Sequence, residues 1–111
     1  MRVLRGAIDD VAGDVRPGSA TIGQRVGADL TAEGGEQRLG PRGFAHGYCT
    51  LTDDCELFYK VDGLYAPDCE GGVIWNDPDL AIDWPVTADG AITSDKDKIL
   101  PRLKDMPEAR F

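Results

Sequence analysis

His46 is the residue of this 111-residue sequence best suited to accept a proton near neutral pH. The ordinary pKa of histidine, about 6.5, lets its imidazole act as a base when the proton lies within hydrogen-bond reach. The flanking residues in GFAHGY are also typical of a histidine with a structural role in a turn. Both roles stay open. A metal site would need several ligands converging on one ion, so a lone histidine predicts no metal.

Arg42, in PRG, and Lys96, in SDKD, are basic residues that could contact a phosphate group. Each also fits an exposed side chain, Arg42 in a surface salt bridge and Lys96 in solvent. The whole chain carries 12 basic and 20 acidic residues, a formal charge of -8, which would repel a nucleic acid backbone. We therefore expect no nucleic acid partner, whereas a small anionic ligand in a locally basic pocket is allowed.

The composition, 41% hydrophobic and 29% charged residues, predicts a folded protein of a single domain, residues 1–111. No apolar run reaches the roughly 18 residues that cross a bilayer. The opening MRVLRGAIDD places charges where a signal peptide would be apolar. We therefore expect a cytoplasmic protein without membrane contact. Cys49, Cys55 and Cys69 form no paired motif, which predicts reduced thiols.

The elements that must position these residues are short strands separated by tight turns. The sequence has 14 glycines and 7 prolines, clustered between brief apolar stretches, as in β-sandwiches and β-barrels. Strands are expected at residues 2–4, 7–15, 21–30, 36–39, 48–51, 55–61 and 73–75. One helix is expected at residues 95–100, with Ser94 as its N-cap and Pro101 as its stop, followed by an irregular tail over the barrel.

In the expected strand at residues 7–15, apolar and polar residues alternate poorly. Strand periodicity places Ala7, Asp9, Val11 and Gly13 on one face, which should be the core face. An unpaired carboxylate is costly to bury, and glycine leaves nothing to pack. We therefore expect an edge strand or a solvated strand, with loose packing near the amino terminus.

Four segments in order resemble the dTDP-4-dehydrorhamnose 3,5-epimerase family. They are DVRPGSATIG (residues 14–23), PRGFAHGY (41–48), ELFYKVDGLYAPDCEGGVIWNDPDLAIDWP (56–85) and SDKD (94–97). The resemblance covers most of the chain, and the order and spacing of the segments carry it.

This resemblance implies an all-β fold, a cupin-type jelly-roll barrel incomplete at its amino-terminal end, with a short C-terminal helix. It also implies a homodimer and an isomerase reaction without metal or organic cofactor. The family inverts the 3- and 5-carbons of a dTDP-4-keto-6-deoxy sugar. The 4-keto group acidifies the neighbouring hydrogens, so a base removes one, an enolate forms, and an acid returns a proton to the opposite face.

By the resemblance, Tyr59 in LFYKV is the catalytic acid and Asp97 is the catalytic aspartate that orients a histidine base. Without it, Tyr59 would be taken to pack in a strand and Asp97 to be a solvated charge. The resemblance also makes His46, Tyr65, Arg42 and Lys96 substrate-binding residues, with Tyr65 stacking near the nucleotide or else packing in the core. Trp75 and Trp84 are expected to pack.

The family's histidine base, in an R-G-L-H motif, and its assisting lysine match no residue of this chain. The resemblance therefore leaves two functions open. One is the epimerase, with the sequence as part of the working polypeptide. The other is a truncated, catalytically inactive cupin that binds a sugar nucleotide.

Overall fold

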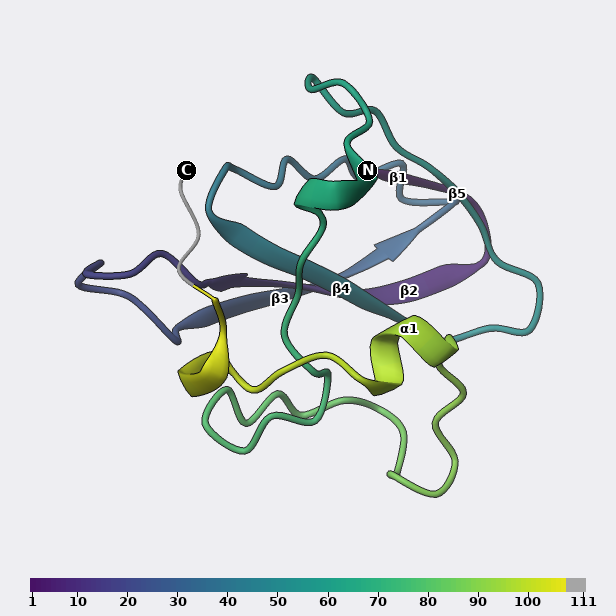
Figure 1. Ribbon diagram of the computed structural model, residues 1–111. Helices are drawn as coiled ribbons and strands as arrows, with labels where there is room; N and C mark the ends of the chain where they lie inside the picture. The colour runs from purple at the N-terminus through teal and green to yellow at the C-terminus, as the bar shows by residue number, and fades with distance from the viewer. Residues whose placement is uncertain (108–111) are drawn as a thin grey trace.

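Five strands and three short helical turns make up the computed structural model, which describes residues 1–107. The strands are β1 (Arg2–Arg5), β2 (Ala7–Asp14), β3 (Arg25–Thr31), β4 (Phe44–Thr50) and β5 (Glu56–Phe58). The helical turns are η1 (Pro67–Cys69), α1 (Asp95–Lys98) and η2 (Leu103–Asp105). Figure 1 shows the strands crossing the middle of the molecule and the C-terminal part of the chain running beside them as long irregular segments. In the part of the chain that the structure describes, no helix has the length and apolarity to cross a membrane.

β2 is the centre of a three-stranded sheet in the order β3-β2-β4, and both pairings are antiparallel. Asp10 lies opposite Ala28 of β3 and opposite Tyr48 of β4. Because side chains alternate along a strand, this register puts the even-numbered residues of β2 on the same face as His46 and Tyr48. The register therefore decides which side chains can meet across the sheet.

A second sheet pairs β1 with β5, and the two sheets share a small core. Val3, Ile8 and Leu30 are 1%, 0% and 3% exposed and form its centre. The chain turns from β1 into β2 at Gly6, which has a φ of 83°. A side chain at that position would also collide with the backbone at Asp54, so the turn requires glycine.

The prediction of a loosely packed or solvated strand at residues 7–15 is wrong. β2 is an interior strand, and residues 10–15 are buried on both of its faces. Asp10 and Asp14 are 0% and 1% exposed, so the face opposite the expected core face carries buried carboxylates. They are tolerated because each has charged or hydrogen-bonding partners, distant in sequence for Asp10 and in the following turn for Asp14.

Asp14 is held by the turn that follows β2. Its carboxylate accepts hydrogen bonds from the hydroxyls of Ser19 and Thr21, both at 2.6 Å. Arg16 adds a bidentate pair, at 2.9 Å from Nε and Nη2. The Arg16 guanidinium, with help from the two hydroxyls and against the effect of burial, holds the pKa of Asp14 well below its usual range.

The predictions of the other strands and of the helix are confirmed in part. β3 begins at Arg25 rather than residue 21, β4 begins at Phe44 rather than residue 48, and β5 ends at Phe58. Residues 36–39 form only an isolated pairing of Gln37 with Arg2, and residues 73–75 form no strand. α1 is confirmed but ends at Lys98, and Ser94 caps it by accepting a hydrogen bond from the Asp97 N–H.

The closing tail is anchored by Asp77. This carboxylate is 2% exposed and accepts hydrogen bonds from the backbone N–H groups of Leu103 and Asp79, at 2.5 Å and 2.7 Å. Burial would raise the pKa of Asp77, but these backbone donors outweigh it and the pKa is lowered. The described part of the tail, residues 101–107, contains the short turn η2 rather than being wholly irregular, and it is fixed to the loop that contains Asp77.

Candidate functional site

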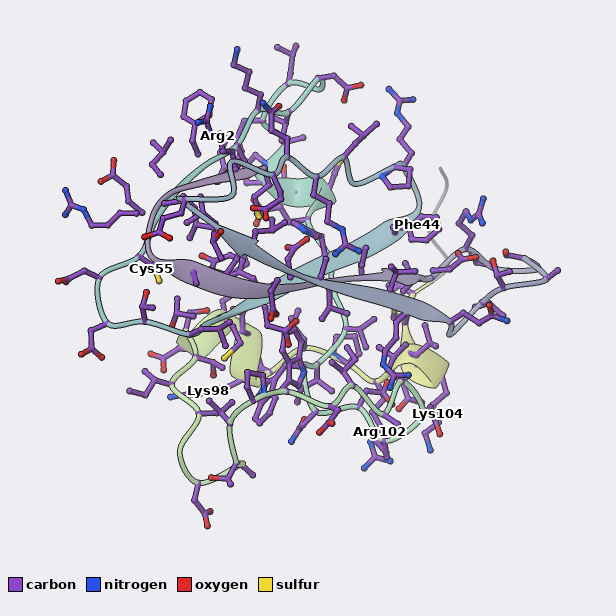
Figure 2. The ribbon with its side chains drawn as sticks, turned by 180° about the vertical axis from the view of Figure 1, so that it is seen from behind. Arg2, Phe44, Cys55, Lys98, Arg102 and Lys104 are labelled. Carbon is purple, nitrogen blue, oxygen red and sulfur yellow. The ribbon has the colours of Figure 1, made fainter. Side chains whose placement is uncertain are left out.

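The six residues named by the sequence lie on different elements. His46 is on β4, Arg42 is exposed in the turn before β4, and Tyr59 follows β5 directly. Tyr65 precedes η1, while Lys96 and Asp97 are in α1. Figure 2 shows the molecule from behind, with Lys98, Arg102 and Lys104 on the segments below the strands and Phe44 at one end of β4.

His46 contacts a buried carboxylate. Its Nε2 lies 2.5 Å from Oδ1 of Asp10, and its side chain is 29% exposed. His46 is opposite Ala12 in the register, two residues along β2 from Asp10, so the two side chains share a face and meet diagonally. A histidine held by a buried carboxylate is an arrangement that orients an imidazole for proton transfer or hydrogen bonding.

Arg38 completes this group from the segment between β3 and β4. Its Nε lies 3.2 Å from the other oxygen of Asp10, Oδ2, and its side chain is 14% exposed. Its Nη1 donates a hydrogen bond to the Asp10 carbonyl at 2.8 Å, and its Nη2 donates to the Val26 carbonyl at 2.7 Å. Arg38 therefore connects β2 with β3, and it also places a positive charge beside the Asp10 carboxylate.

Lys96 is paired with Glu70. Lys96 Nζ lies 2.6 Å from Glu70 Oε2, and both side chains remain largely accessible. The hydrogen bond to Glu70 raises the pKa of Lys96, with smaller contributions from the charges of Tyr65 and Asp97. The pairing connects α1 with the end of η1, two segments whose paired residues are 26 positions apart in the sequence. The Lys96 ammonium group stays accessible at this contact.

The two tyrosines are accessible. Tyr59 is 66% exposed and Tyr65 is 81% exposed, so neither packs in a strand or in the core. Among residues 1–107, no hydrogen bond or ion pair joins His46 to Tyr59 or to Asp97. The roles assigned to these side chains by resemblance stay predictions.

One hollow of about 280 Å³ lies beside β4. Its lining includes Trp75, Trp84, Tyr48 and Cys49, together with residues 90–93, and includes none of the six sequence-predicted residues. Trp84 also packs on Gly47 and donates an indole hydrogen bond to the Trp75 carbonyl at 2.7 Å, which agrees with a packing role. Burial raises the pKa of the Cys49 thiol at its edge. In the described residues, no three histidine, cysteine or acidic side chains are grouped so as to hold a metal ion.

Sequence reasoning missed Asp10, Arg38 and Glu70. From the sequence, the carboxylate of Asp9 was weighed but that of Asp10 was not, although a carboxylate inside a strand is a signal for a buried cationic partner. Arg38 and His46 lie 28 and 36 residues further along the chain, and nothing in the sequence fixes their contact with Asp10. Only the register of β2 with its two neighbours brings the three together.

Solved structures of sugar-nucleotide epimerases share this fold. A crystal structure of dTDP-4-dehydrorhamnose 3,5-epimerase from Bacillus anthracis, with TDP and PPi bound, matches 91% of this chain with a TM-score of 0.87 and 50% sequence identity. The epimerase of Legionella pneumophila, in complex with dTDP-4-keto-L-rhamnose, matches 96% of it with a TM-score of 0.83 and 37% identity. These matches confirm the all-β, cupin-type fold expected from the sequence, and the strands of residues 1–107 form two open sheets rather than a closed barrel.

Curated relatives agree with the structures. The dTDP-4-dehydrorhamnose 3,5-epimerase of Methanothermobacter thermautotrophicus is 43% identical over 108 residues, and that of Escherichia coli K12 is 43% identical over 106 residues. Each alignment covers 96% of this chain, and they cover 58% and 57% of the two relatives. The family described as dTDP-4-dehydrorhamnose 3,5-epimerase matches residues 1–105, so the chain belongs to that family. It spans somewhat more than half the length of these relatives and of the matched structures.

Proposed function

We propose that this chain contributes the substrate site and the acid of a dTDP-4-dehydrorhamnose 3,5-epimerase. The observation that carries the proposal is the family match over residues 1–105, supported by the likeness to structures that hold TDP or a dTDP-keto sugar. The substrate is a dTDP-4-keto-6-deoxy sugar. The reaction moves protons at the 3- and 5-carbons and needs no cofactor, because the substrate's own ketone stabilises the carbanion as an enolate.

In this reaction Tyr59 supplies the returning proton. Its side chain is 66% exposed, so its hydroxyl is open to a ligand and to reprotonation from solvent. His46, oriented through Nε2 by Asp10, lies along the sugar and hydrogen-bonds it. Asp97 is accessible at α1 and orients the histidine base, which is not among these 111 residues.

The nucleotide is held by accessible side chains outside the sheet. Tyr65, 81% exposed, offers an aromatic face for stacking, and Arg42 is exposed before β4. Lys96 exchanges its partner Glu70 for the diphosphate, which is a doubly charged and therefore stronger acceptor. Local cations thus bind an anion on a protein whose net charge is -8.

We also place the protein in the cytoplasm and expect two copies to associate. Three free thiols fit a reducing compartment. Leu39, Leu64 and Ile92 are 89%, 98% and 99% exposed, and a second copy would remove such side chains from water.

The test is hydrogen exchange at the sugar. The chain is incubated with dTDP-4-dehydro-6-deoxyglucose in deuterated water, and proton NMR follows loss of the signals at the 3- and 5-carbons. Because the family's histidine base matches none of these residues, exchange above the enzyme-free rate would mean that His46 serves as a substitute base. Such exchange supports the proposal, and Tyr59→Phe is then expected to slow complete epimerisation about 100-fold or more, as loss of a general acid does. Tyr65→Phe is the matched control, because it keeps the stacking ring. No exchange by a chain that still binds the nucleotide sugar would instead support an inactive sugar-nucleotide cupin.

A further inference from the structure

We infer that Arg38 is a positioning residue of this site. Arg38 balances the charge of the buried Asp10, so that His46 stays a neutral imidazole with its proton on Nε2 and its Nδ1 free to accept a hydrogen bond from the sugar. The use of Nδ1 rests on the proposed function, whereas the arrangement of Arg38, Asp10 and His46 does not.

Asp10 is shielded from solvent. Its carboxylate is 0% exposed, and neither oxygen makes a hydrogen bond of regular geometry. The close contacts with the Arg38 guanidinium, at Nε, and with His46 Nε2 therefore offset the cost of burying it. A nitrogen and an oxygen 2.5 Å apart attract one another only when they share a proton, and the inference assigns this proton to Nε2.

Arg38 is fixed independently of His46. Its two terminal nitrogens donate to the carbonyls of Asp10 and Val26, on two different strands. A guanidinium stays charged at any pH at which the protein folds. One buried carboxylate thus has one permanent cation, and the imidazole does not have to become a second cation to neutralise it.

Other charged groups nearby do not replace Arg38. Asp9, the neighbour of Asp10 on β2, points to the opposite face and is itself an acid whose pKa is raised, first by burial and then by Asp29 and Asp10. Tyr48 lies opposite Asp10 on β4. Arg16, at the far end of the same face, is already paired with Asp14. Removing Arg38 would therefore leave Asp10 to His46 alone.

The chain contains one histidine, so the NMR signals of its two ring nitrogens can be assigned without ambiguity. Long-range proton–nitrogen NMR correlations of the labelled chain at pH 7 distinguish the two neutral tautomers from the imidazolium. The wild type is expected to show the Nε2–H tautomer. In Arg38→Met the ratio of imidazolium to imidazole should rise about tenfold, because an unbalanced carboxylate in contact favours the charged ring.

Three further variants sharpen the test. Arg25→Met, at an exposed position of β3, is the matched control and should leave the spectrum of His46 unchanged. Arg38→Lys keeps a cation without the planar fork, so it should keep His46 neutral even if the sheet is less stable. In Asp10→Asn the amide can turn its NH₂ group toward His46, which should shift the imidazole to the Nδ1–H tautomer.

An unchanged ratio in a folded Arg38→Met chain would overturn the inference, as would an equal rise in Arg38→Met and Arg38→Lys. Should Arg38→Met fail to fold, Arg38→Lys and Asp10→Asn still decide it through the charge and the tautomer of His46. The ligand step is read separately, by adding saturating dTDP-4-dehydro-6-deoxyglucose. A shift of Nδ1 supports its use as an acceptor, and an unshifted Nδ1 with bound sugar overturns that use while the three-residue arrangement stands. Failure of the proposed epimerase reaction alone would appear as missing hydrogen exchange with the same His46 spectrum.

Discussion

The three-stranded sheet and the segment of residues 59–107 hold their polar residues in different ways. On the sheet, Asp10 and Asp14 are 0% and 1% exposed, and each is surrounded by partners that the strands and turns fix in place. In the later segment, Lys96 and Glu70 form a pair whose side chains are 67% and 41% exposed. The sheet therefore presents an oriented His46 before any ligand arrives, whereas the segment presents groups that a ligand must still organise. Breaking one region should affect the other little, and the predictions below test this.

The largest effect is expected in the core beneath the sheet. Ile8→Ala removes a side chain that is 0% exposed and packs with Val3 and Leu30, and should cost about 2–5 kcal/mol of unfolding free energy. Urea unfolding measures it. Ile99→Ala, at a position 84% exposed in the later segment, is the matched control and should stay within about 0.5 kcal/mol of wild type. Equal losses in the two variants would mean that the regions do not differ in packing.

The next effect concerns Asp14 and pH. Because its pKa is lower in the folded chain than the ordinary 3.9 or so, its ionised form stabilises the fold above about pH 4, and this contribution is lost as the pH falls further. Asp14→Asn should therefore be less stable than wild type at pH 7, and the difference should shrink as the pH is lowered from about 5 toward 2.

Thermal unfolding of Asp14→Asn and wild type across that pH range measures this stability difference. Asp95→Asn, whose wild-type carboxylate is fully exposed in α1, is the control, and its stability should follow that of wild type at every pH. A stability difference between Asp14→Asn and wild type that does not change with pH would contradict the assignment of a lowered pKa.

The fold of the sheet was partly predictable from sequence. Turn residues around residues 7–15 and 21–30 predict two strands, and both exist. The start of β4 was missed because Gly43 and Gly47 lower strand propensity there, and only pairing with β2 makes residues 44–47 extended. Residues 36–39 were expected to form a strand because turn residues flank them, but Arg38 turns its side chain onto the sheet and only Gln37 pairs.

The candidate site was predictable only as far as its residue types. The motifs name His46, Tyr59 and Lys96, but a partner such as Asp10 or Glu70 depends on contacts between segments 26 to 36 residues apart. Local propensity carries no information about such contacts. The burial of the strand at residues 7–15 was misjudged for the same reason, since a buried carboxylate such as Asp10 is costly only when it lacks partners.

A smaller effect is expected where the tail joins its loop. Asp77→Ala leaves the N–H groups of Leu103 and Asp79 without their acceptor and should cost about 1–3 kcal/mol locally. Native-state hydrogen exchange should show faster exchange of the Leu103 amide and unchanged protection of the amides of β2. Asp79→Ala is the control, because Asp79 takes part through its backbone and its side chain is exposed. Lost protection throughout β2 in Asp77→Ala would show that the two regions unfold together.

The smallest effect on stability, and the most specific effect on binding, is expected at Lys96 and Glu70. Exposed ion pairs contribute little, so Lys96→Gln and Glu70→Gln should unfold at the same urea concentration as wild type. Their effects on the affinity for dTDP should be opposite: Lys96→Gln should weaken binding about threefold to tenfold by removing the proposed phosphate contact, whereas Glu70→Gln should strengthen it by removing the competing carboxylate. Titration calorimetry at two salt concentrations measures both. Weaker binding in both variants would mean that the intact pair itself holds the nucleotide, and the later segment would then be preorganised in the same sense as the sheet.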